Sequence, residues 1–137
     1  MNDQDEVKKI YDTIKVYTVL GDPLPLARAR FGQGHVYDSQ KNHKLVIGIT
    51  LQSQYDDPPL TGPLHVEITF FMHIPRTQKK IFPGFNHSKK PDIDNLLKLY
   101  LDVCKNIFYL DDNQVASLYA KKIYGKEPKT EIRIIPL

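Results

Sequence analysis

The sequence has very little cysteine: its 137 residues include one, Cys104. A single thiol excludes an intrachain disulfide framework and a zinc site built from cysteine pairs, and it suits a reducing compartment. No stretch approaches the roughly 18 apolar residues that a membrane-spanning helix requires. The opening residues, MNDQDEVKK, contain acids and no apolar core. We therefore expect no secretory signal, no membrane partner and a cytoplasmic location.

Common catalytic motifs are also missing. The sequence contains no G-x-S-x-G, no P-loop and no G-x-G-x-x-G, and its five histidines have no zinc-site spacing. Internal repeats and low-complexity segments are absent as well. The length predicts one domain over residues 1–137, with residues 1–12 forming a loose or briefly helical N-terminal arm.

Positive charge is concentrated in the second half of the chain. Residues 1–72 hold 7 basic and 9 acidic side chains, whereas residues 73–137 hold 12 and 7, which gives net charges of −2 and +5. A basic half suits a polyanionic partner such as DNA. Segments of this charge are also common as ordinary solvated surface, so charge alone does not decide the function.

Alternating apolar residues predict four β-strands, at residues 14–20, 64–73, 114–124 and 130–135. The turn that begins at Gly125 is expected to join the last two strands as an antiparallel pair. Residues 21–34 contain two prolines and three glycines and are expected to be irregular.

Two segments have helical spacing. In residues 43–54 the apolar side chains Leu45, Val46 and Ile49 favour a helix, although the β-branched residues there are also compatible with a strand. Residues 92–107 carry a clear apolar stripe of helical period. Together these elements predict an α+β fold, a small mixed β-sheet with helices packed on one face.

The second of these helices carries acidic residues at its start. Asp92 follows Pro91 and is a natural N-cap, and Asp94 lies in the first turn, where the helix dipole favours an anion. Asp94, Lys98 and Asp102 share one side of the helix, clear of the apolar stripe. An ordinary ion pair between Asp94 and Lys98 is one explanation for this side.

A second acidic pair, Asp111–Asp112, follows this helix. A turn held by backbone amides would explain one of these carboxylates, but adjacent carboxylates repel each other. Together with Asp92 and Asp94, the pair supplies hard oxygen donors of the kind that Mg²⁺ prefers. The acidic residues therefore indicate either a solvated surface or a magnesium site.

Chain geometry restricts how such a site could form. A helix from Asp94 to Ile107 is about 20 Å long at 1.5 Å per residue. The five residues up to Asp112 can return at most about 16–18 Å. Asp112 therefore reaches Asp94 of the same chain only with difficulty. Either the helix ends early, or two chains related by a two-fold axis share their sites.

The loop that precedes this helix, residues 74–91, is basic and contains no acid. Its lysines and arginine could contact DNA phosphates, and Phe82 and Phe85 could stack on exposed bases. A solvated connection would have the same composition. The candidate DNA-binding residues, including two from the irregular segment, are Arg28, Arg30, Arg76, Lys79, Lys80, Lys89 and Lys90.

The stretch K-P-D-I-D-N-L-L-K-x₃-D-x₈-D-D-N-Q-V, from Lys90 to Val115, resembles the RusA family of Holliday junction resolvases. The opening GDPLPLARARF followed by VYDSQKN is similar to the start of that family. Here Arg28-Ala-Arg30 lacks the proline of the family's R-P-R.

The resemblance implies a small α+β homodimer whose metal sites need both subunits. It implies Mg²⁺-dependent nicking of branched, four-way DNA in recombination and repair, with Mn²⁺ as a substitute metal. Asp92, Asp94 and Asp112 match the family's metal ligands, Lys98 matches its essential lysine, and Asp111 is a candidate outer ligand. The catalytic set is thus Asp92, Asp94, Lys98 and Asp112.

Two other functions compete with this one. A non-catalytic dimer could bind branched DNA through its basic half and leave the DNA uncut. A metal-dependent phosphatase for small substrates would instead have a closed pocket and little salt dependence. The basic loop favours the nuclease over the phosphatase.

Overall fold

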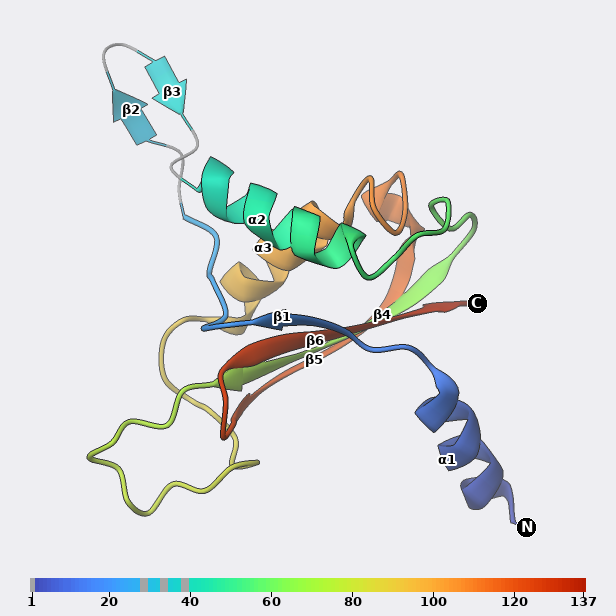
Figure 1. Cartoon of the computed structure of the whole chain (residues 1–137), viewed down its shortest axis with the longest axis horizontal. Coiled ribbons are helices and arrows are strands. Elements are labelled where there is room, and N and C mark those ends of the chain that lie inside the picture. Colours follow the sequence, from blue (N-terminus) through green and yellow to red (C-terminus); the bar gives the residue numbers. More distant parts are fainter. Residues whose placement is uncertain (1, 28–29, 33–34, 38–39) are drawn as a thin grey trace.

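The computed structural model describes residues 2–27, 30–32, 35–37 and 40–137. Helix α1, Asp3–Thr13, projects from the sheet as an arm (Figure 1), and its described side chains are exposed. The N-terminal segment, for which a loose or briefly helical arm was expected, thus contains an 11-residue helix. Within the described residues, no helix combines the length and apolar character required to cross a membrane.

A four-stranded sheet forms the centre of the molecule. Its strands are β1 (Tyr17–Leu20), β4 (Leu64–Met72), β5 (Val115–Tyr124) and β6 (Lys129–Pro136), in the order β1-β6-β4-β5. Strand β4 is antiparallel to β6 and parallel to β5, so the sheet is mixed as predicted. Every second side chain of β4 is buried, which explains its clear alternation in the sequence.

The predicted pairing of the last two strands is wrong. Strands β5 and β6 are joined by a short turn, but β4 lies between them in the sheet. The turn crosses the end of β4 closely: Gly125 N donates to Met72 O at 2.9 Å, and a Cβ at Gly125 would lie 2.7 Å from Phe71 Cβ. Glycine permits this approach. The sequence signals a turn here but not that a third strand lies beneath it.

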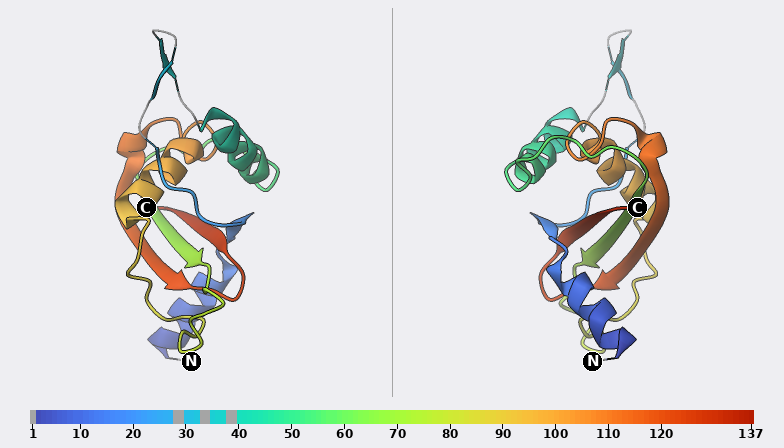
Figure 2. Two further views of the ribbon diagram at one scale, coloured as in Figure 1. Left: turned by 90° about the vertical axis from the view of Figure 1, so that its left-hand side faces the viewer. Right: turned by 90° about the vertical axis from the view of Figure 1, so that its right-hand side faces the viewer.

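Helices α2 (Lys41–Gln52) and α3 (Ile93–Cys104) both lie on one face of the sheet, as predicted (Figures 1 and 2). Helix α3 buries Leu96, Leu99 and Tyr100 in the core. The ring of Tyr100 packs on Phe70 of β4 with 5.6 Å between centroids. Burial of such side chains is worth about 1.5–3 kcal/mol each before entropy costs. It fixes the rotation of α3, so that the opposite face of the helix points outward.

Helix α3 ends at Cys104, three residues before the predicted end. Asn106 has a positive φ of 72°, a conformation that asparagine tolerates better than most residues. The amides of Ile107 and Phe108 both donate to Cys104 O, at 3.1 and 3.0 Å. The chain then runs back beside the helix, where the Tyr109 hydroxyl donates to Leu101 O at 3.0 Å. The early-ending helix is therefore the geometry that this chain adopts.

The irregular segment contains a small hairpin that was not predicted. Strands β2 (Arg30–Gly32) and β3 (His35–Tyr37) pair with each other in a separate sheet. The hairpin projects beyond α2, at the opposite end of the molecule from α1 (Figure 2). Strands of three residues are too short to show alternation in the sequence.

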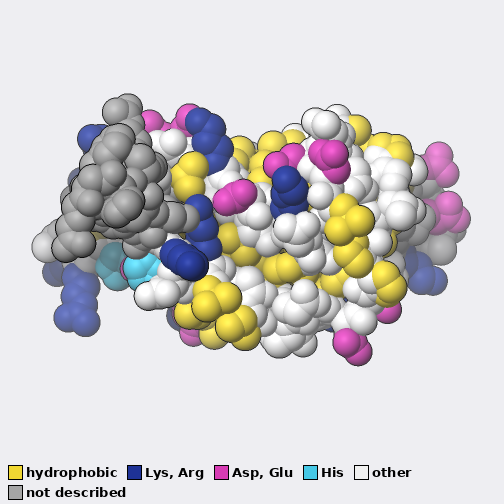
Figure 3. Space-filling view, turned by 90° about the horizontal axis from the view of Figure 1, so that it is seen from above, with side chains coloured by type: hydrophobic (Ala, Val, Ile, Leu, Met, Phe, Trp, Pro, Cys, Tyr) yellow, Lys and Arg dark blue, Asp and Glu magenta, His cyan; other side chains and the backbone are white. Residues whose placement is uncertain are grey.

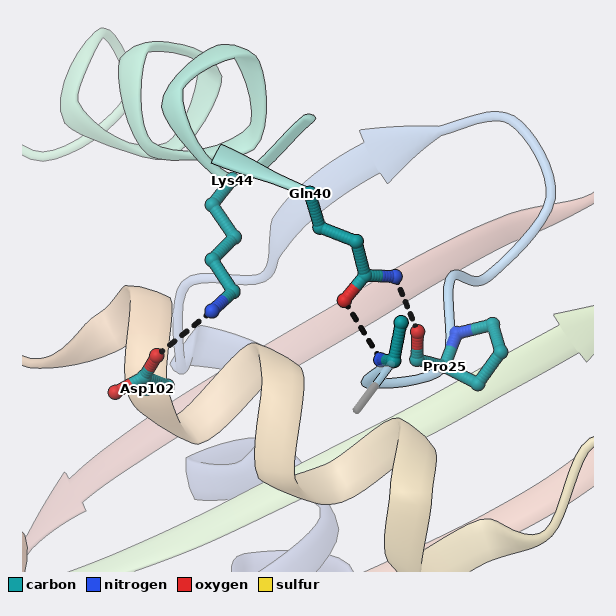
Figure 4. Close-up of polar contacts among 5 residues, drawn as sticks. Pro25, Gln40, Lys44 and Asp102 are labelled. Atoms are coloured by element: carbon teal, nitrogen blue, oxygen red, sulfur yellow. Dashed lines mark hydrogen bonds and ion pairs between the residues drawn. The ribbon is translucent and has the colours of Figure 1, made fainter. Parts of the chain in front are cut away.

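Gln40, a buried polar side chain, helps to hold the irregular part before the hairpin. Gln40 precedes α2 and accepts a hydrogen bond from Ala27 N at 2.7 Å, while its amide donates to Pro25 O at 2.6 Å (Figure 4). Leu26 N donates to Asn95 O of α3 at 2.9 Å. These bonds hold residues 25–27 between the two helices.

Candidate active site

Lys98 and Asp112 line the same open cavity. Lys98 extends from the outward face of α3, and Asp112 is the first residue of η1 (Asp112–Gln114), a single 3₁₀ turn that precedes β5. The early end of α3 and the return of the chain bring Asp112 to the level of Lys98. The cavity is lined by Leu26, Lys44, Lys98, Leu101, Asp102, Tyr109, Asp112 and Val115.

The two adjacent aspartates have different surroundings. Asp111 caps η1: its carboxylate accepts a hydrogen bond from Asn113 N at 2.8 Å, and Gln114 Oε1 accepts from Asp111 N in return. Gln114 Nε2 also donates to Leu60 O and Gly62 O. The carboxylate of Asp111 is thus hydrogen-bonded within the turn, whereas Asp112 is exposed and lines the cavity.

An ion pair forms one wall of this cavity. Lys44 Nζ lies 3.4 Å from Asp102 Oδ2 and joins α2 to α3 (Figure 4). Asp102 was expected on the same side of the helix as Lys98. Lys44 was not among the candidates, because nothing in the sequence indicates that position 44 contacts position 102. Only the packing of α2 on α3 brings them together.

Tyr109 contributes a hydroxyl group at the inner side of the cavity. Burial raises the pKa of Tyr109 well above its ordinary value, and the negative charges of Asp112 and Asp102 add to this effect. Its hydroxyl therefore stays protonated and donates to Leu101 O, which fixes the chain just before the acidic pair.

Asp92 and Asp94 lie at the other end of α3. Asp92 is the N-cap residue, but its side chain makes no capping hydrogen bond, and both carboxylates are exposed. Asp92 lines a neighbouring cavity with Pro23, Pro25, Leu26, Lys90, Pro91 and Asn95. Leu26 lines both cavities, so Asp112 in the first cavity and Asp92 in the second lie on either side of this residue.

The candidate metal ligands do not converge within one chain. Among the residues that the structure describes, no three Asp, Glu, His or Cys side chains lie close enough to hold a metal ion. The donors have the right chemistry, because Asp92, Asp94 and Asp112 are carboxylates exposed to solvent. The set fits a magnesium ion only if a further chain or a movement brings these carboxylates together.

The basic loop lies beside β5. Its candidate residues Arg76, Lys79, Lys80, Lys89 and Lys90 are all exposed. The second half of the loop is fixed to the strand, because Gly84 N donates to Tyr124 O, Tyr124 N to Phe85 O, and His87 N to Lys122 O, at 2.7–3.0 Å. This half is therefore not merely a solvated connection.

Lys122 is a second residue that sequence reasoning did not select. Its ammonium group donates to Lys89 O and to Pro91 O, at 2.7 Å each, directly before Asp92. Adjacent residues of a strand point to opposite faces of the sheet, so Lys121 and Lys122 diverge, but this alternation does not show what either side chain contacts. The bonds position the start of α3 and hence its two carboxylates.

The remaining basic candidates are less defined. Arg28 lies outside the described residues, and Arg30 belongs to β2, where the structure describes the backbone alone. Phe82 and Phe85 of the basic loop are 60% and 52% exposed, and their rings lie 5.7 Å apart in an edge-on arrangement. Exposed aromatic rings next to lysines are suited to contact nucleic-acid bases.

Comparison with known proteins points to a nuclease family. The model of the family "Endodeoxyribonuclease RusA" matches residues 21–135. A protein of Bacillus subtilis (strain 168), "Uncharacterized protein YqaN", is 28% identical over 90% of this chain and 96% of its own length. The "Crossover junction endodeoxyribonuclease rusA" of Lactococcus phage r1t is 38% identical over 53% of each chain.

Proposed function

Because the chain belongs to the RusA family of endodeoxyribonucleases, we propose that its substrate is the four-way DNA junction. It resolves Holliday junctions by paired symmetric nicks, in recombination and repair. The name of the phage relative supports this substrate, since that protein is a crossover junction endodeoxyribonuclease. We further propose that residues 1–137 act as one cytoplasmic nuclease domain, with residues 1–12 as an arm.

One observation carries the proposal. The second half of α3 and the loop after it lie between Lys98 and Asp112 in the chain, yet the two residues line one cavity. Both belong to the motif that the chain shares with the family. A structural role alone does not account for Asp112, because its neighbour Asp111 already caps the turn.

The proposed chemistry is metal-assisted hydrolysis of a phosphodiester. Asp92, Asp94 and Asp112 would hold Mg²⁺, for which Mn²⁺ can substitute. The ion, when bound, neutralises the scissile phosphate and lowers the pKa of an attacking water. Lys98 donates hydrogen bonds to a non-bridging phosphate oxygen and stabilises the charge that develops there. No side chain needs to act as a nucleophile.

DNA binding rests on the basic residues that flank this site. Lys89 and Lys90 directly precede Asp92, while Arg76, Lys79 and Lys80 extend the positive surface along the loop; Arg28 and Arg30 are further proposed phosphate contacts. Phosphate contacts make binding strongly salt-dependent. We propose that Phe82 and Phe85 stack on bases that are exposed at the branch point.

The test is to incubate the protein with a labelled four-way junction and a linear duplex of the same sequence, with and without Mg²⁺. We expect symmetric nicks in the junction only, and only with the metal. A protein that binds the junction tightly but leaves it uncut with Mg²⁺ and Mn²⁺ would be a non-catalytic binder of branched DNA. The separation of the carboxylates within one chain is the observation that favours that second function.

A further inference from the structure

Lys122 of β5 holds the end of the basic loop by its side chain. Its ammonium group donates to Lys89 O and to Pro91 O, at 2.7 Å each, although these carbonyls lie 33 and 31 residues earlier in the chain. Two of the three N–H donors of the group are thereby used on the backbone of the loop. Lys122 is also half-buried, whereas its neighbour Lys121 is exposed. The Lys122 side chain thus lies against the loop instead of extending into solvent.

No opposite charge holds Lys122 in this position. In the described part of the chain, no carboxylate forms an ion pair with it. Hydrogen bonds to the two carbonyls replace the water that a half-buried ammonium group loses. A lysine that served only as a surface charge would need neither the burial nor these bonds. The surroundings of Lys122 therefore indicate a structural contact with the loop.

This contact fixes the part of the loop that other hydrogen bonds do not reach. Bonds between main-chain atoms join the loop to β5 as far as His87, whose amide donates to Lys122 O at 3.0 Å. Within the described structure, residues 88–91 make no hydrogen bond between main-chain atoms. The two bonds from the Lys122 side chain therefore connect this segment to the sheet.

Residues 88–91 join two parts of the proposed site. Lys89 and Lys90 are proposed phosphate contacts, and Asp92, a proposed metal ligand, follows shortly after them in the chain. The position of the two lysines relative to Asp92 therefore decides which phosphodiester reaches the carboxylates. Successive phosphates of one strand are about 3.4 Å apart along the axis of duplex DNA, so a small movement of this segment would present a neighbouring bond.

Surface charge alone does not define that position. Figure 3 looks onto the side of the molecule that carries α2 and α3, where acidic and basic side chains lie next to one another rather than in separate patches. Such a surface does not by itself select one register of a DNA strand, because every phosphate carries the same charge. Phosphate contacts fix the register only when their own spacing is fixed.

We propose that Lys122 is a positioning residue that selects the phosphodiester to be cut. The inference rests on the proposed nuclease function, and it adds a residue that touches neither the DNA nor the metal. By bonding to Lys89 and Pro91, Lys122 keeps the phosphate-binding end of the loop at a constant distance from Asp92. The strand held by the loop then presents the same bond to the site in every turnover.

Limited proteolysis tests the contact without DNA or metal. Trypsin requires an opened backbone at Lys89, so cleavage there reports how firmly residues 88–91 are held. Lys122→Met retains an unbranched side chain but donates no hydrogen bond, and cleavage after Lys89 should become about tenfold faster than in wild type. Lys122→Arg should be cut at the wild-type rate, because the guanidinium group also supplies several donors.

Two controls separate a local effect from a general loss of stability. Cleavage after Lys79, in the first half of the loop, should be unchanged in every variant and serves as the internal reference. Lys121→Met, at the exposed neighbour on the opposite face of β5, should be cut after Lys89 at the wild-type rate. An unchanged rate in Lys122→Met, or an equal increase at Lys79, overturns the proposal.

The positions of the nicks test the consequence for the reaction. On a labelled four-way junction, the wild-type protein should cut mainly one phosphodiester in each of two opposed strands. Lys122→Met should divide the cuts among neighbouring phosphodiesters, and Lys122→Arg should restore the single position. A general structural defect would lower the amount of active protein without moving the cuts. Unchanged nick positions in Lys122→Met therefore contradict the proposal.

Junction affinity distinguishes a positioning residue from a direct phosphate contact. Loss of one phosphate contact reduces the slope of log affinity against log salt concentration by about one. Because the Lys122 ammonium group is bonded to the loop, we expect Lys122→Met to keep the wild-type slope. A slope reduced by about one would identify Lys122 as a phosphate contact and exclude the positioning role.

Failure of this inference and failure of the proposed function give different results. A protein that cuts no junction with Mg²⁺ or Mn²⁺ removes the nuclease function, whatever the proteolysis shows. A protein that cuts the same phosphodiester with and without the Lys122 ammonium group keeps the nuclease function and loses the inference.

Discussion

Two neighbouring carboxylates at the end of the return loop illustrate how single residues divide their tasks. The Asp111 side chain accepts a backbone hydrogen bond within η1, and the Asp112 side chain faces the cavity that contains Lys98. The sequence shows only that two acids are adjacent. Backbone geometry decides which of them is available for chemistry, and the difference can be measured.

We expect Asp112→Asn to abolish junction cleavage while the thermal stability stays unchanged, because its carboxylate makes no hydrogen bond within the described structure. Asp111→Ala should instead lower the free energy of unfolding by about 1 kcal/mol, the usual cost of a lost cap. Urea denaturation and a junction-nicking assay on both variants separate the two roles. Equal loss of stability in both would contradict this division.

Lys98 gives a second prediction at this scale. Lys98→Met retains the alkyl chain but removes the charge that we propose stabilises the transition state, so the cleavage rate should fall about 10²–10³-fold. Junction affinity should change far less, because the remaining basic residues still contact phosphates. Lys105→Met is the matched control: Lys105 is exposed at the end of the same helix, outside the cavity. A similar rate loss in the control would exclude a specific role for Lys98.

At the scale of elements, His87 joins the basic loop to β5. Its amide donates to Lys122 O, and its ring packs on Tyr124 with 4.7 Å between centroids. Burial lowers the pKa of His87, and the positive charges of Lys122 and Lys89 lower it further. Its Nδ1 atom is buried and has no hydrogen-bond partner in the described structure. The neutral ring is therefore the form that the folded loop accommodates.

The pH dependence of stability follows from this lowered pKa. In the unfolded chain the His87 ring binds a proton near pH 6.5, whereas in the folded chain it binds the proton only at a lower pH. The stabilising contribution is therefore complete above about pH 6.5 and is lost as the pH falls through the folded-state pKa. We expect the melting temperature of wild type to fall faster between pH 7 and pH 5 than that of His87→Phe. His73→Phe, at an exposed residue, should follow the wild-type profile.

The elements also show what the sequence can and cannot predict. Helices α2 and α3 and all four sheet strands were predicted close to their observed positions, because each carries a periodic pattern of apolar residues. The position of β4 between β5 and β6 was missed, because pairing depends on which strand edges meet after folding. The early end of α3 depends on Asn106, whose left-handed conformation is a weak local signal.

The candidate site could also be predicted in part from the sequence, because several of its residues recur at regular spacing. The acidic residues and Lys98 stand out by their spacing, whereas Lys44 and Lys122 do not, since they act through contacts with distant segments.

The apolar residues of α2 show a limit of periodicity at the scale of elements. Leu45, Val46 and Ile49 predicted a helix correctly, yet they face outward. Periodicity thus detects a helix without telling whether its apolar side meets the core of its own chain or a partner.

At the scale of the whole molecule, the question is whether one chain or two chains bring the candidate carboxylates together in one metal site. Each chain presents Asp112 with Lys98 in one cavity and Asp92 in the next, separated by Leu26. A site completed within one chain requires Asp112, which lines a cavity with Lys98 in the middle of α3, to approach Asp92 and Asp94 at the start of that helix, whose position is fixed by its buried face. A site completed between two chains requires only the docking of exposed surfaces.

Mixed dimers distinguish these two arrangements. Asp94→Asn and Asp112→Asn homodimers should each be inactive. In a shared-site dimer, one Asp94→Asn chain and one Asp112→Asn chain leave one site with its carboxylates intact and one site with two changes. With random pairing, the nicking rate should recover to about a quarter of wild type, because half of the dimers are mixed and each holds one working site of two.

The product of the mixed dimers provides a sharper criterion than the rate. A single working site nicks one strand of the junction but cannot make the opposed nick, so nicked junctions should accumulate and resolved duplexes should not. Co-expressing the two variants with different affinity tags isolates the mixed dimer, and a denaturing gel of the labelled strands identifies the product. If the isolated mixed dimer is as inactive as its parents, the carboxylates belong to one chain, and α3 together with the loop after it must then move to bring them together.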